Sequence, residues 1–530
     1  MNMKKFKLIT IALFALIALN SCSDFLTTEL TDPKKTSDTY YKTPSDAFSA
    51  LVGCYNGLDL IWNNGPAFPV ASEVFSDNCF GGCGSTDGYG YEMMDEFNKS
   101  ISPSDNSLFG PDWKPYYQAI YRCNVLLGKM DQVTWGDSIN LKKQYKAEAK
   151  FIRAFCYFDM VRLWEKVPLI TVPTLANVAQ TDPAITYAQI MSDLRYAADS
   201  LSSNVYSSVP NGRVTKWAAE SLLARVYLFY SGYYGVTTIG GETSATALAA
   251  VEDVIAHSGH ALVSDFTSLW PCPSVAKKVN YAGEDNPEVV FQIKYSSTQD
   301  YNGNITGNGW MVMEGVRDQS IYPYQYGWGA CTVDPKLYNT FSSADSRKFA
   351  SITAIKEENL SYTKSADNRE YTGYYLKKYS PICDQNNVSI VSNFQIGQYQ
   401  DYFAIRYSDV LLMAAELGSS KAATYYNWVH QRAIPTATAV ASVSKADIMA
   451  ERQLEFVGEG IRYWDLLRQG VDIAATTIAN NTTLSYLQDG ATPPTAAKFK
   501  ANIIATRGFQ QIPNDQITLS SGVLKQNAGW

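Results

Sequence analysis

The densest group of side chains able to do acid–base chemistry lies in ERQLEFVGEGIRYWDLLRQG, residues 451–470. Glycoside hydrolysis needs only two suitably placed carboxylates, so this stretch has to be considered as a catalytic site. The side chains in question carry both signs of charge and are Glu451, Glu455, Glu459, Arg462, Asp465 and Arg468. Sequence alone does not exclude a glycosidase.

The same stretch also has the pattern of a packed helix. Apolar residues recur at the spacing of one helical face, at Leu454, Val457, Ile461 and Trp464. Glu459 and Asp465 each lie three residues from Arg462 and can pair with it along a helix. Gly458 and Gly460 permit close backbone approach. We therefore interpret residues 451–470 as a structural helix with a charge network.

Other catalytic patterns are missing from the sequence. It has only three histidines, His257, His260 and His430, and no HExxH, GxSxG, phosphate-loop lysine or GxGxxG motif after a strand. His257 and His260 are spaced like metal ligands, but no Cys or carboxylate partner is close in sequence. Cys79 and Cys83 lack the second pair that a zinc site requires. We predict no catalytic residue, metal site or cofactor; a structural calcium ion is possible but nothing indicates one.

The sequence favours a binding function over catalysis, because aromatic residues are concentrated in glycine-rich loops. Tyr (36) outnumbers Phe (22), and tyrosine offers a flat apolar face with a polar tip. The first candidate cluster, around residues 78–91, consists of Asp77, Asn78, Tyr89 and Tyr91. The second, within residues 301–329, consists of Trp310, Tyr322, Tyr324, Tyr326 and Trp328, with Arg317 and Asp318.

The second cluster is the stronger candidate. In an extended segment, alternate residues share one face, so Tyr322, Tyr324 and Tyr326 would line up for stacking on a ligand. The alternatives are that these rings cover the scaffold or face a protein partner. Residues 356–400 form a third, polar and irregular stretch of the kind in which binding loops occur.

Helices must position these loops. Apolar periodicity predicts helices over 44–60, 113–130, 144–164, 186–201, 215–230, 408–417 and 445–468. Short strands are expected around 288–295 and 374–379. The fold class is therefore mainly α, with helix pairs that suggest tetratricopeptide-like stacking in a loose 34-residue register. The chain exceeds one typical core, and we divide it into 22–235 and 270–530.

The N-terminus has the pattern of a bacterial lipoprotein signal. Lys4, Lys5 and Lys7 precede an apolar run over residues 8–19, which is too short for a bilayer span of about 20 residues. Cys22 follows directly, so we predict a signal peptide over 1–21 and a lipid-bearing Cys22. Two or three acyl chains anchor a protein firmly. The alternative is an ordinary signal peptide with a chance cysteine.

The net charge narrows the range of possible binding partners. The net charge of −7 becomes −10 when the three lysines of residues 1–21 are removed. An acidic chain argues against nucleic acid as a ligand and against docking on anionic lipid.

Eight cysteines remain after Cys22, scattered through a chain large enough to build its own core. We expect zero to two disulfides, with Cys79 and Cys83 close enough to pair locally.

Several segments, in order along nearly the whole chain, resemble the SusD/RagB family of nutrient-binding outer-membrane lipoproteins. They are KAEAKFIRAFCYFDMVRLWEKVPLI (146–170), GRVTKWAAESLLARVYLF (212–229), NPEVVFQIKY (286–295), YFAIRYSDVLLMAAEL (402–417) and the 451–470 stretch. The ending GFQQIPNDQITLSSGVLKQNAGW is similar to the family's closing motif, with Ala528 where proline is usual.

This resemblance implies a mainly α-helical, SusD-like protein anchored in the outer membrane and facing outward. It implies a SusC-like TonB-dependent transporter as partner and a glycan as ligand, bound without catalysis. Some relatives handle peptides, so a peptide-binding lipoprotein with the same type of partner is the alternative, and a surface glycosidase is a third. The family's ligand residues lie in variable loops, so none is carried over to this chain.

Overall fold

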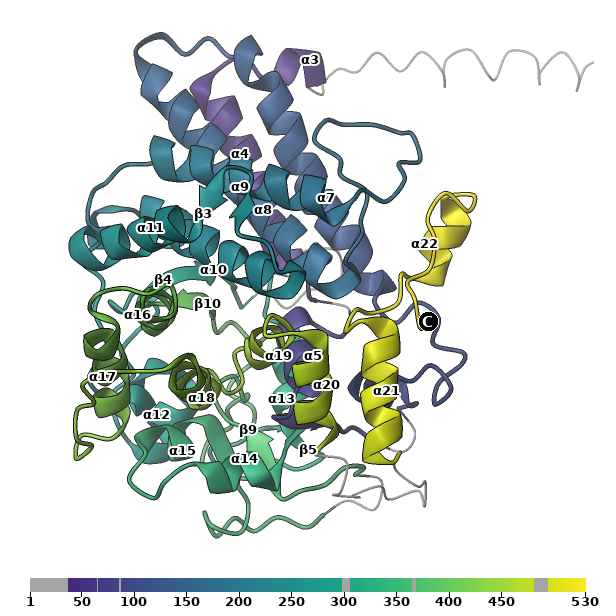
Figure 1. Ribbon diagram of the computed structural model, residues 1–530, viewed down its shortest axis with the longest axis vertical. Coiled ribbons are helices and arrows are strands. Elements are labelled where there is room, and N and C mark those ends of the chain that lie inside the picture. Colours follow the sequence, from purple (N-terminus) through teal and green to yellow (C-terminus); the bar gives the residue numbers. More distant parts are fainter. Residues whose placement is uncertain (1–36, 64, 85–86, 298–305, 365–367, 481–493) are drawn as a thin grey trace, which may run out of the picture.

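The computed structural model describes residues 37–530 except 64, 85–86, 298–305, 365–367 and 481–493. Helices dominate the described chain and strands are few and short (Figure 1), as the sequence predicts. Within these residues, no helix is both long and apolar enough to cross a membrane. The predicted signal peptide and Cys22 lie outside the described residues.

A layer of long helices forms the upper part of Figure 1. Consecutive helices pack together, α4 on α7, α7 on α8, α8 on α9, α9 on α10 and α10 on α11. The layer contains α3 (Ser37–Tyr40), α4 (Pro44–Leu60), α7 (Gly110–Lys129), α8 (Ile139–Trp164), α9 (Pro183–Ser200), α10 (Lys216–Tyr234) and α11 (Ser244–His257). Every helix predicted in this region is present.

Local sequence signals explain where these helices begin and end. Thr43 caps α4 in a reciprocal capping box with Asp46, and Pro44 occupies the first turn. Thr215 caps α10, which ends at Gly235 in the left-handed conformation. The buried face of α8 is continuous from Phe151 to Trp164 and forms the centre of the main core.

Shorter elements build the lower part of Figure 1. Its helices are α5 (Phe68–Val74), α6 (Gly90–Asp95), α12 (Pro271–Lys277), α13 (Met311–Glu314), α14 (Pro335–Thr340), α15 (Ser346–Ser351), α16 (Tyr407–Glu416), α17 (Ala422–Ala433), α18 (Lys445–Glu455), α19 (Arg462–Leu467), α20 (Val471–Ala479) and α21 (Ala496–Thr506). The last helix, α22 (Asn514–Leu519), lies beside the helical layer and contacts α7.

The strands form four small sheets. They are β1 (Cys79–Gly81), β2 (Thr238–Ile239), β3 (Glu242–Thr243), β4 (Val289–Ile293), β5 (Val316–Arg317), β6 (Tyr326–Gly327), β7 (Cys331–Val333), β8 (Ile352–Ala354), β9 (Tyr374–Leu376) and β10 (Tyr402–Arg406). The largest sheet is antiparallel in the order β1-β7-β9-β8, while β4 pairs with β10, β2 with β3, and β5 in parallel with β6. β4 and β9 fall within the two predicted strand regions.

The predicted single helix over 445–468 is wrong, because the structure has two. α18 ends at Glu455 and α19 begins at Arg462. Gly458 and Gly460 between them have φ values of 76° and 70°, a left-handed conformation that breaks a helix. A Cβ atom on Gly460 would lie 2.8 Å from the Cα of Pro69, so the glycine also permits close packing on α5.

An early segment of the chain is built into the late part of the fold. α5, β1 and α6 leave the helical layer; β1 pairs with β7, and α5 packs against α19. This insertion carries the glycine-rich loop of residues 78–91 to the side of residues 310–328. The two sequence clusters are neighbours for that reason.

The cysteines in the described part of the chain are free and buried. They are Cys54, Cys79, Cys83, Cys123, Cys156, Cys272, Cys331 and Cys383. The outcome is therefore the lower end of the predicted range, with no disulfide among them. Burial raises the pKa of the Cys83 thiol above its usual value, which keeps it protonated and unreactive.

Candidate functional site

The second predicted cluster forms a compact turn rather than an extended strand. β5 and β6 pair in parallel, and between them Ile321 and Tyr324 exchange two backbone hydrogen bonds of 2.8 Å. The tyrosines therefore do not share one face. Tyr322 and Tyr326 are half-buried, Trp328 is 36% exposed, and Tyr324 is turned inward at 1% exposed.

Two aromatic residues of the cluster are part of the protein interior. Trp310 is fully buried; its Nε1 donates to the Tyr295 hydroxyl at 3.4 Å, and its ring packs on Tyr379 and Tyr402. The Tyr324 hydroxyl donates to Glu358. Neither ring has a free face in this structure, so we leave both out of the contact surface proposed below.

The first predicted cluster divides in the same way. Asn78 is buried and donates to Glu73 at 2.9 Å, while Asp77 accepts two hydrogen bonds from Arg462, at 2.8 and 2.9 Å. These residues hold the inserted segment in place. Tyr89 and Tyr91 are half-buried and remain partly open to solvent.

The structure joins residues of both clusters around Arg317, which is itself buried at 8% exposed. Arg317 forms ion pairs with Asp87 at 2.9 Å and with Asp318 at 3.2 Å. The Tyr91 hydroxyl lies 3.5 Å from the sulfur of Met313. A Cβ atom on Gly81 would lie 2.4 Å from the Tyr91 carbonyl oxygen, so only glycine permits this approach.

A third loop contributes a ring that sequence reasoning missed. Phe394 packs against Tyr326 with ring centroids 4.4 Å apart and an interplanar angle of 37°. Its stretch, 356–400, stood out as an irregular loop region, but nothing in the pattern identifies Phe394. We call Tyr91, Tyr322, Tyr326, Trp328 and Phe394 the aromatic loop cluster, with Arg317, Asp318 and Asp87 as its charged border.

This arrangement suits the binding of a polar ligand that has flat faces. Partly exposed rings offer stacking surfaces, and the exposed carboxylates of Asp87 and Asp318 in the charged border offer hydrogen-bond acceptors. The Arg317 guanidinium is held on two sides by carboxylates, which fixes its orientation. Within the described residues, no three His, Cys, Asp or Glu side chains are grouped to hold a metal ion.

The histidine pair does not converge either. Nδ1 of His257 lies 2.6 Å from Asp253 on the surface of α11. Nδ1 of His260 lies 3.0 Å from the Pro287 carbonyl oxygen, which as an acceptor assigns the proton to that nitrogen. The two side chains therefore have separate partners.

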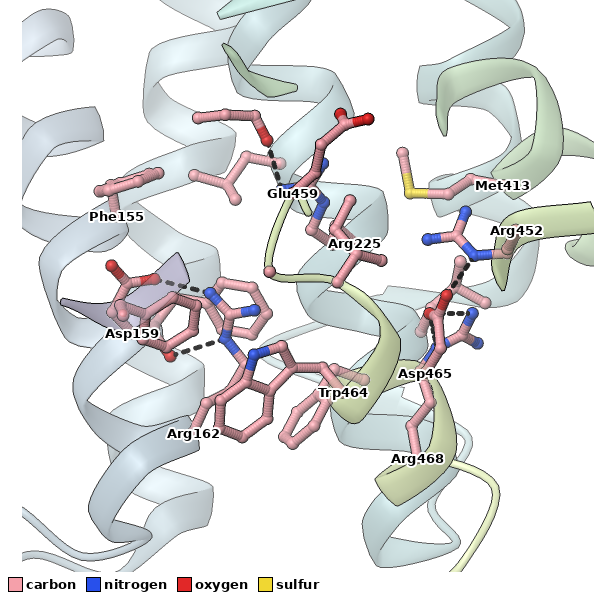
Figure 2. Close-up of a pocket in the computed structure, with 18 of the residues that line it drawn as sticks. Phe155, Asp159, Arg162, Arg225, Met413, Arg452, Glu459, Trp464, Asp465 and Arg468 are labelled. Atoms are coloured by element: carbon pink, nitrogen blue, oxygen red, sulfur yellow. Dashed lines mark hydrogen bonds and ion pairs between the residues drawn. The ribbon is translucent and has the colours of Figure 1, made fainter. Parts of the chain in front are cut away.

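Four charged residues of 451–470 line a small internal cavity (Figure 2), namely Arg452, Glu459, Asp465 and Arg468. Asp159 and Arg162 of α8 lie on one side, and Arg452, Asp465 and Arg468 lie on the other. The cavity measures about 40 Å³. At roughly 10–15 Å³ for each water molecule, it holds a few waters and no sugar residue. An active site for glycan cleavage does not fit here.

The carboxylates in and around this network are engaged in ion pairs and are not arranged as reacting groups. Burial alone would raise the pKa of Asp409, but Arg225 at 3.0 Å and Arg452 at 2.5 Å hold it well below its usual value. Arg406 contacts Glu288, Glu455 and Glu459 at 2.5, 2.8 and 2.7 Å, all buried. The structural interpretation of 451–470 agrees with this network, although Arg462 pairs with Asp77 and not along its own helix.

Comparison with known proteins identifies the class as SusD-like. A family model described as starch-binding and associating with the outer membrane matches residues 87–228, and the SusD family model matches residues 350–530. A SusD-like protein of Formosa agariphila is 26% identical over 519 residues, covering 88% of this chain and 92% of its own. A SusD-like protein of Bacteroides ovatus is 25% identical over 496 residues, covering 87% and 82%.

Solved structures share the fold. A laminarin-binding SusD-like protein is 26% identical and superposes with a TM-score of 0.73, covering 92% of this chain and all of its own. A surface glycan-binding protein of Bacteroides thetaiotaomicron in complex with laminarihexaose is 24% identical with a TM-score of 0.75, at the same coverage. The chain belongs to the SusD/RagB family.

Proposed function

We propose that this protein is a surface lipoprotein of the outer membrane that binds a glycan and passes it to a SusC-like TonB-dependent transporter without cleaving it. The observation that carries the proposal is the aromatic loop cluster, in which Trp328, Tyr326 and Phe394 offer rings beside the Arg317 border. Pyranose rings present C–H faces that stack on such rings, and their hydroxyls pair with charged and amide groups.

Several observations support this choice of ligand and the absence of catalysis. Relatives of the same fold bind laminarin or laminarihexaose. The densest carboxylate group of the chain is enclosed in the ion-pair network and reaches no open cleft. The proposed contact residues are those of the aromatic loop cluster and its charged border, together with Tyr89 of the same glycine-rich loop.

The anchor and the transporter rest on the sequence and the family. The lysines, apolar run and Cys22 favour a lipid at the mature N-terminus. A binding protein that is fixed to the membrane needs only modest affinity, because a polymer can engage neighbouring copies and handover requires release.

The test is affinity electrophoresis in gels that contain laminarin, together with calorimetry against laminarihexaose. We expect Trp328→Ala to weaken binding about tenfold, since a ring stack contributes roughly 1–3 kcal/mol. Tyr121→Ala is the matched control, because Tyr121 is 54% exposed on α7 and outside the cluster. Binding unchanged by both Trp328→Ala and Tyr326→Ala, with intact folding, would refute the site.

The alternative functions have separate readouts in the same experiment. A peptide-binding protein would show no heat of binding with laminarihexaose in calorimetry, and would show a heat of binding with a mixed peptide library. A glycosidase would release reducing ends from laminarin during overnight incubation. Neither result is expected. Of the carboxylates that line the hollow beside α11, Glu242 pairs with Arg195, and Glu220 and Asp253 pair with Lys216, which favours a structural role. The aromatic loop cluster is built from rings rather than from strand edges.

A further inference from the structure

A second exposed tryptophan lies far from the aromatic loop cluster. Trp428 on α17 is 46% exposed, compared with 36% for Trp328. It borders a hollow of about 570 Å³, lined also by His260, Tyr407, Gln431 and Arg432. That volume lies within the range of about 300–1,000 Å³ found for small-ligand sites. We call it the Trp428 hollow.

A second hollow adjoins the first. It measures about 500 Å³ and is lined by Tyr206, Asn211, Asn286, Gln292 and His260, among others. We call it the Tyr206 hollow. His260 lines both hollows, so they meet at its side chain.

His260 lies where the two hollows meet and is held firmly in place. Its ring stacks on Tyr206 at a centroid distance of 4.2 Å and an angle of 16°, and it lies 6.4 Å from the ring of Tyr407. Its Nδ1 is held by the Pro287 carbonyl oxygen at 3.0 Å. The three rings form a fixed stack that needs no rearrangement to receive a ligand, which lowers the entropic cost of binding.

The charges in the hollows exclude an anionic ligand. Arg432 is already paired with Glu288 at 2.8 Å and with Glu455 at 2.5 Å. Arg213, at the Tyr206 hollow, donates to Glu148 at 3.0 Å. What remains is polar or acidic: Gln431 donates to the Ala437 carbonyl oxygen, which leaves its own carbonyl oxygen for another donor, and the carboxylates of Glu284 and Asp285 line the Tyr206 hollow.

Ring faces next to amide groups fit hydroxyl-rich ligands. Trp428 and Gln431 line one hollow, and Tyr206, Asn211 and Asn286 line the other, so each hollow has an aromatic ring and an amide. Apolar side chains also line the hollows, among them Leu262 and Pro435 in the first and Val289 and Phe291 in the second. A nucleic acid would meet paired arginines and the Glu284 and Asp285 carboxylates. Rings, amides and carboxylates together favour an uncharged, hydroxyl-rich saccharide chain.

We propose that the Trp428 and Tyr206 hollows form a second saccharide-binding groove, with these two rings as its stacking platforms. The groove goes beyond the proposed function, and it rests on that function for the class of ligand. In Figure 1, α17 lies at the left edge while β5 of the aromatic loop cluster lies to the lower right. A long glycan engaged at both places would be held by avidity.

The test observes each site separately. The eleven tryptophans are replaced with 5-fluorotryptophan, and the ¹⁹F resonances of Trp328 and Trp428 are assigned from Trp328→Phe and Trp428→Phe. Laminarihexaose, maltohexaose and cellohexaose are then titrated into the full chain. We expect the Trp428 resonance to shift with at least one of the three, and the shift to persist in Trp328→Ala.

Variants connect the shift to affinity. Trp428→Ala and Tyr206→Ala should each weaken retardation in a gel of the matching polysaccharide about tenfold, in the Trp328→Ala background. Tyr121→Ala, an exposed aromatic residue outside both hollows, should leave retardation unchanged.

The outcomes separate this inference from the proposed function. If Trp328 shifts and Trp428 stays fixed up to millimolar sugar, the second groove is overturned and the proposed function stands. If Trp428 shifts and Trp328 does not, the groove is supported and the aromatic loop cluster fails. If neither resonance moves with any of the three sugars, both are overturned.

Discussion

Replacing Trp464 with alanine is expected to lower the free energy of unfolding by about 3–5 kcal/mol, the usual cost of removing a buried tryptophan. The side chain is only 4% exposed, and its ring stacks on Phe68 at 5.2 Å and 10°. It also adjoins the internal cavity of about 40 Å³, so the deleted ring would enlarge an existing void. Surrounding ion pairs resist collapse into that void, which places the cost in the upper half of the range.

Polar terms add little to this estimate. The Trp464 Nε1 donates to the Ser72 hydroxyl at 2.9 Å, but that hydroxyl itself donates to the Phe68 carbonyl oxygen at 2.6 Å and keeps this partner in the variant. Arg162 lies 5.1 Å from the Trp464 ring and retains the rings of Phe158 at 3.9 Å and Phe68 at 4.5 Å. The loss is therefore one of packing.

The assay is urea unfolding followed by far-ultraviolet circular dichroism, with laminarin binding measured at a temperature where the variant is folded. Tyr121→Ala is the control, because removing an aromatic ring that is 54% exposed and outside both proposed sites should change stability by less than about 0.5 kcal/mol. A loss below about 1 kcal/mol would refute the packing argument. So would lost glycan binding in a variant whose unfolding midpoint is unchanged.

Three further changes test other parts of the structure. Arg406→Met should cost about 3–5 kcal/mol in urea unfolding, because it leaves Glu288, Glu455 and Glu459 buried beside fewer cations; Lys445→Met, at an exposed lysine, should cost almost nothing. Burial lowers the pKa of His260 to about 4, so its contribution to stability is complete above about pH 6.5 and is lost as pH falls toward 4. His260→Phe should flatten the fall of the unfolding midpoint across that window, and an equally steep fall in His260→Phe and in the exposed control His257→Phe would contradict this. Cys22→Ser should move the protein from membranes to the soluble fraction after high-salt washing in a strain without the transporter, and retention on membranes would overturn the anchor.

The helical frame was predictable because its signals are local. Apolar periodicity and caps such as Thr43 and Thr215 lie within the segments that they define. The break within 445–468 was not predicted, although Gly458 and Gly460 lie there. The apolar residues on both sides of these glycines keep helical spacing, and that spacing indicates a single helix. Only contact with Pro69, far away in sequence, makes the left-handed backbone necessary there.

The candidate site was predictable as a set of loops but not as a set of contacts. Composition identified the loops of 78–91 and 301–329, yet gave no means of separating buried Trp310 from exposed Trp328. That difference depends on Tyr379 and Tyr402 enclosing one ring, and local sequence does not specify such packing. Phe394 and Tyr326, whose rings pack together, are likewise far apart in sequence.

The insertion of α5, β1 and α6 into the late part of the fold has a consequence for export. Glu73 is fully buried, and one of its carboxylate oxygens accepts a hydrogen bond from the backbone nitrogen of Gly460, 387 residues later. A chain that emerges from a translocation channel N-terminus first presents Glu73, Asp77 and strand β1 long before their partners exist. Such long-range pairing slows folding. The helical layer can form early, but the proposed binding loops reach their positions only after Gly460 and Arg462 have been delivered.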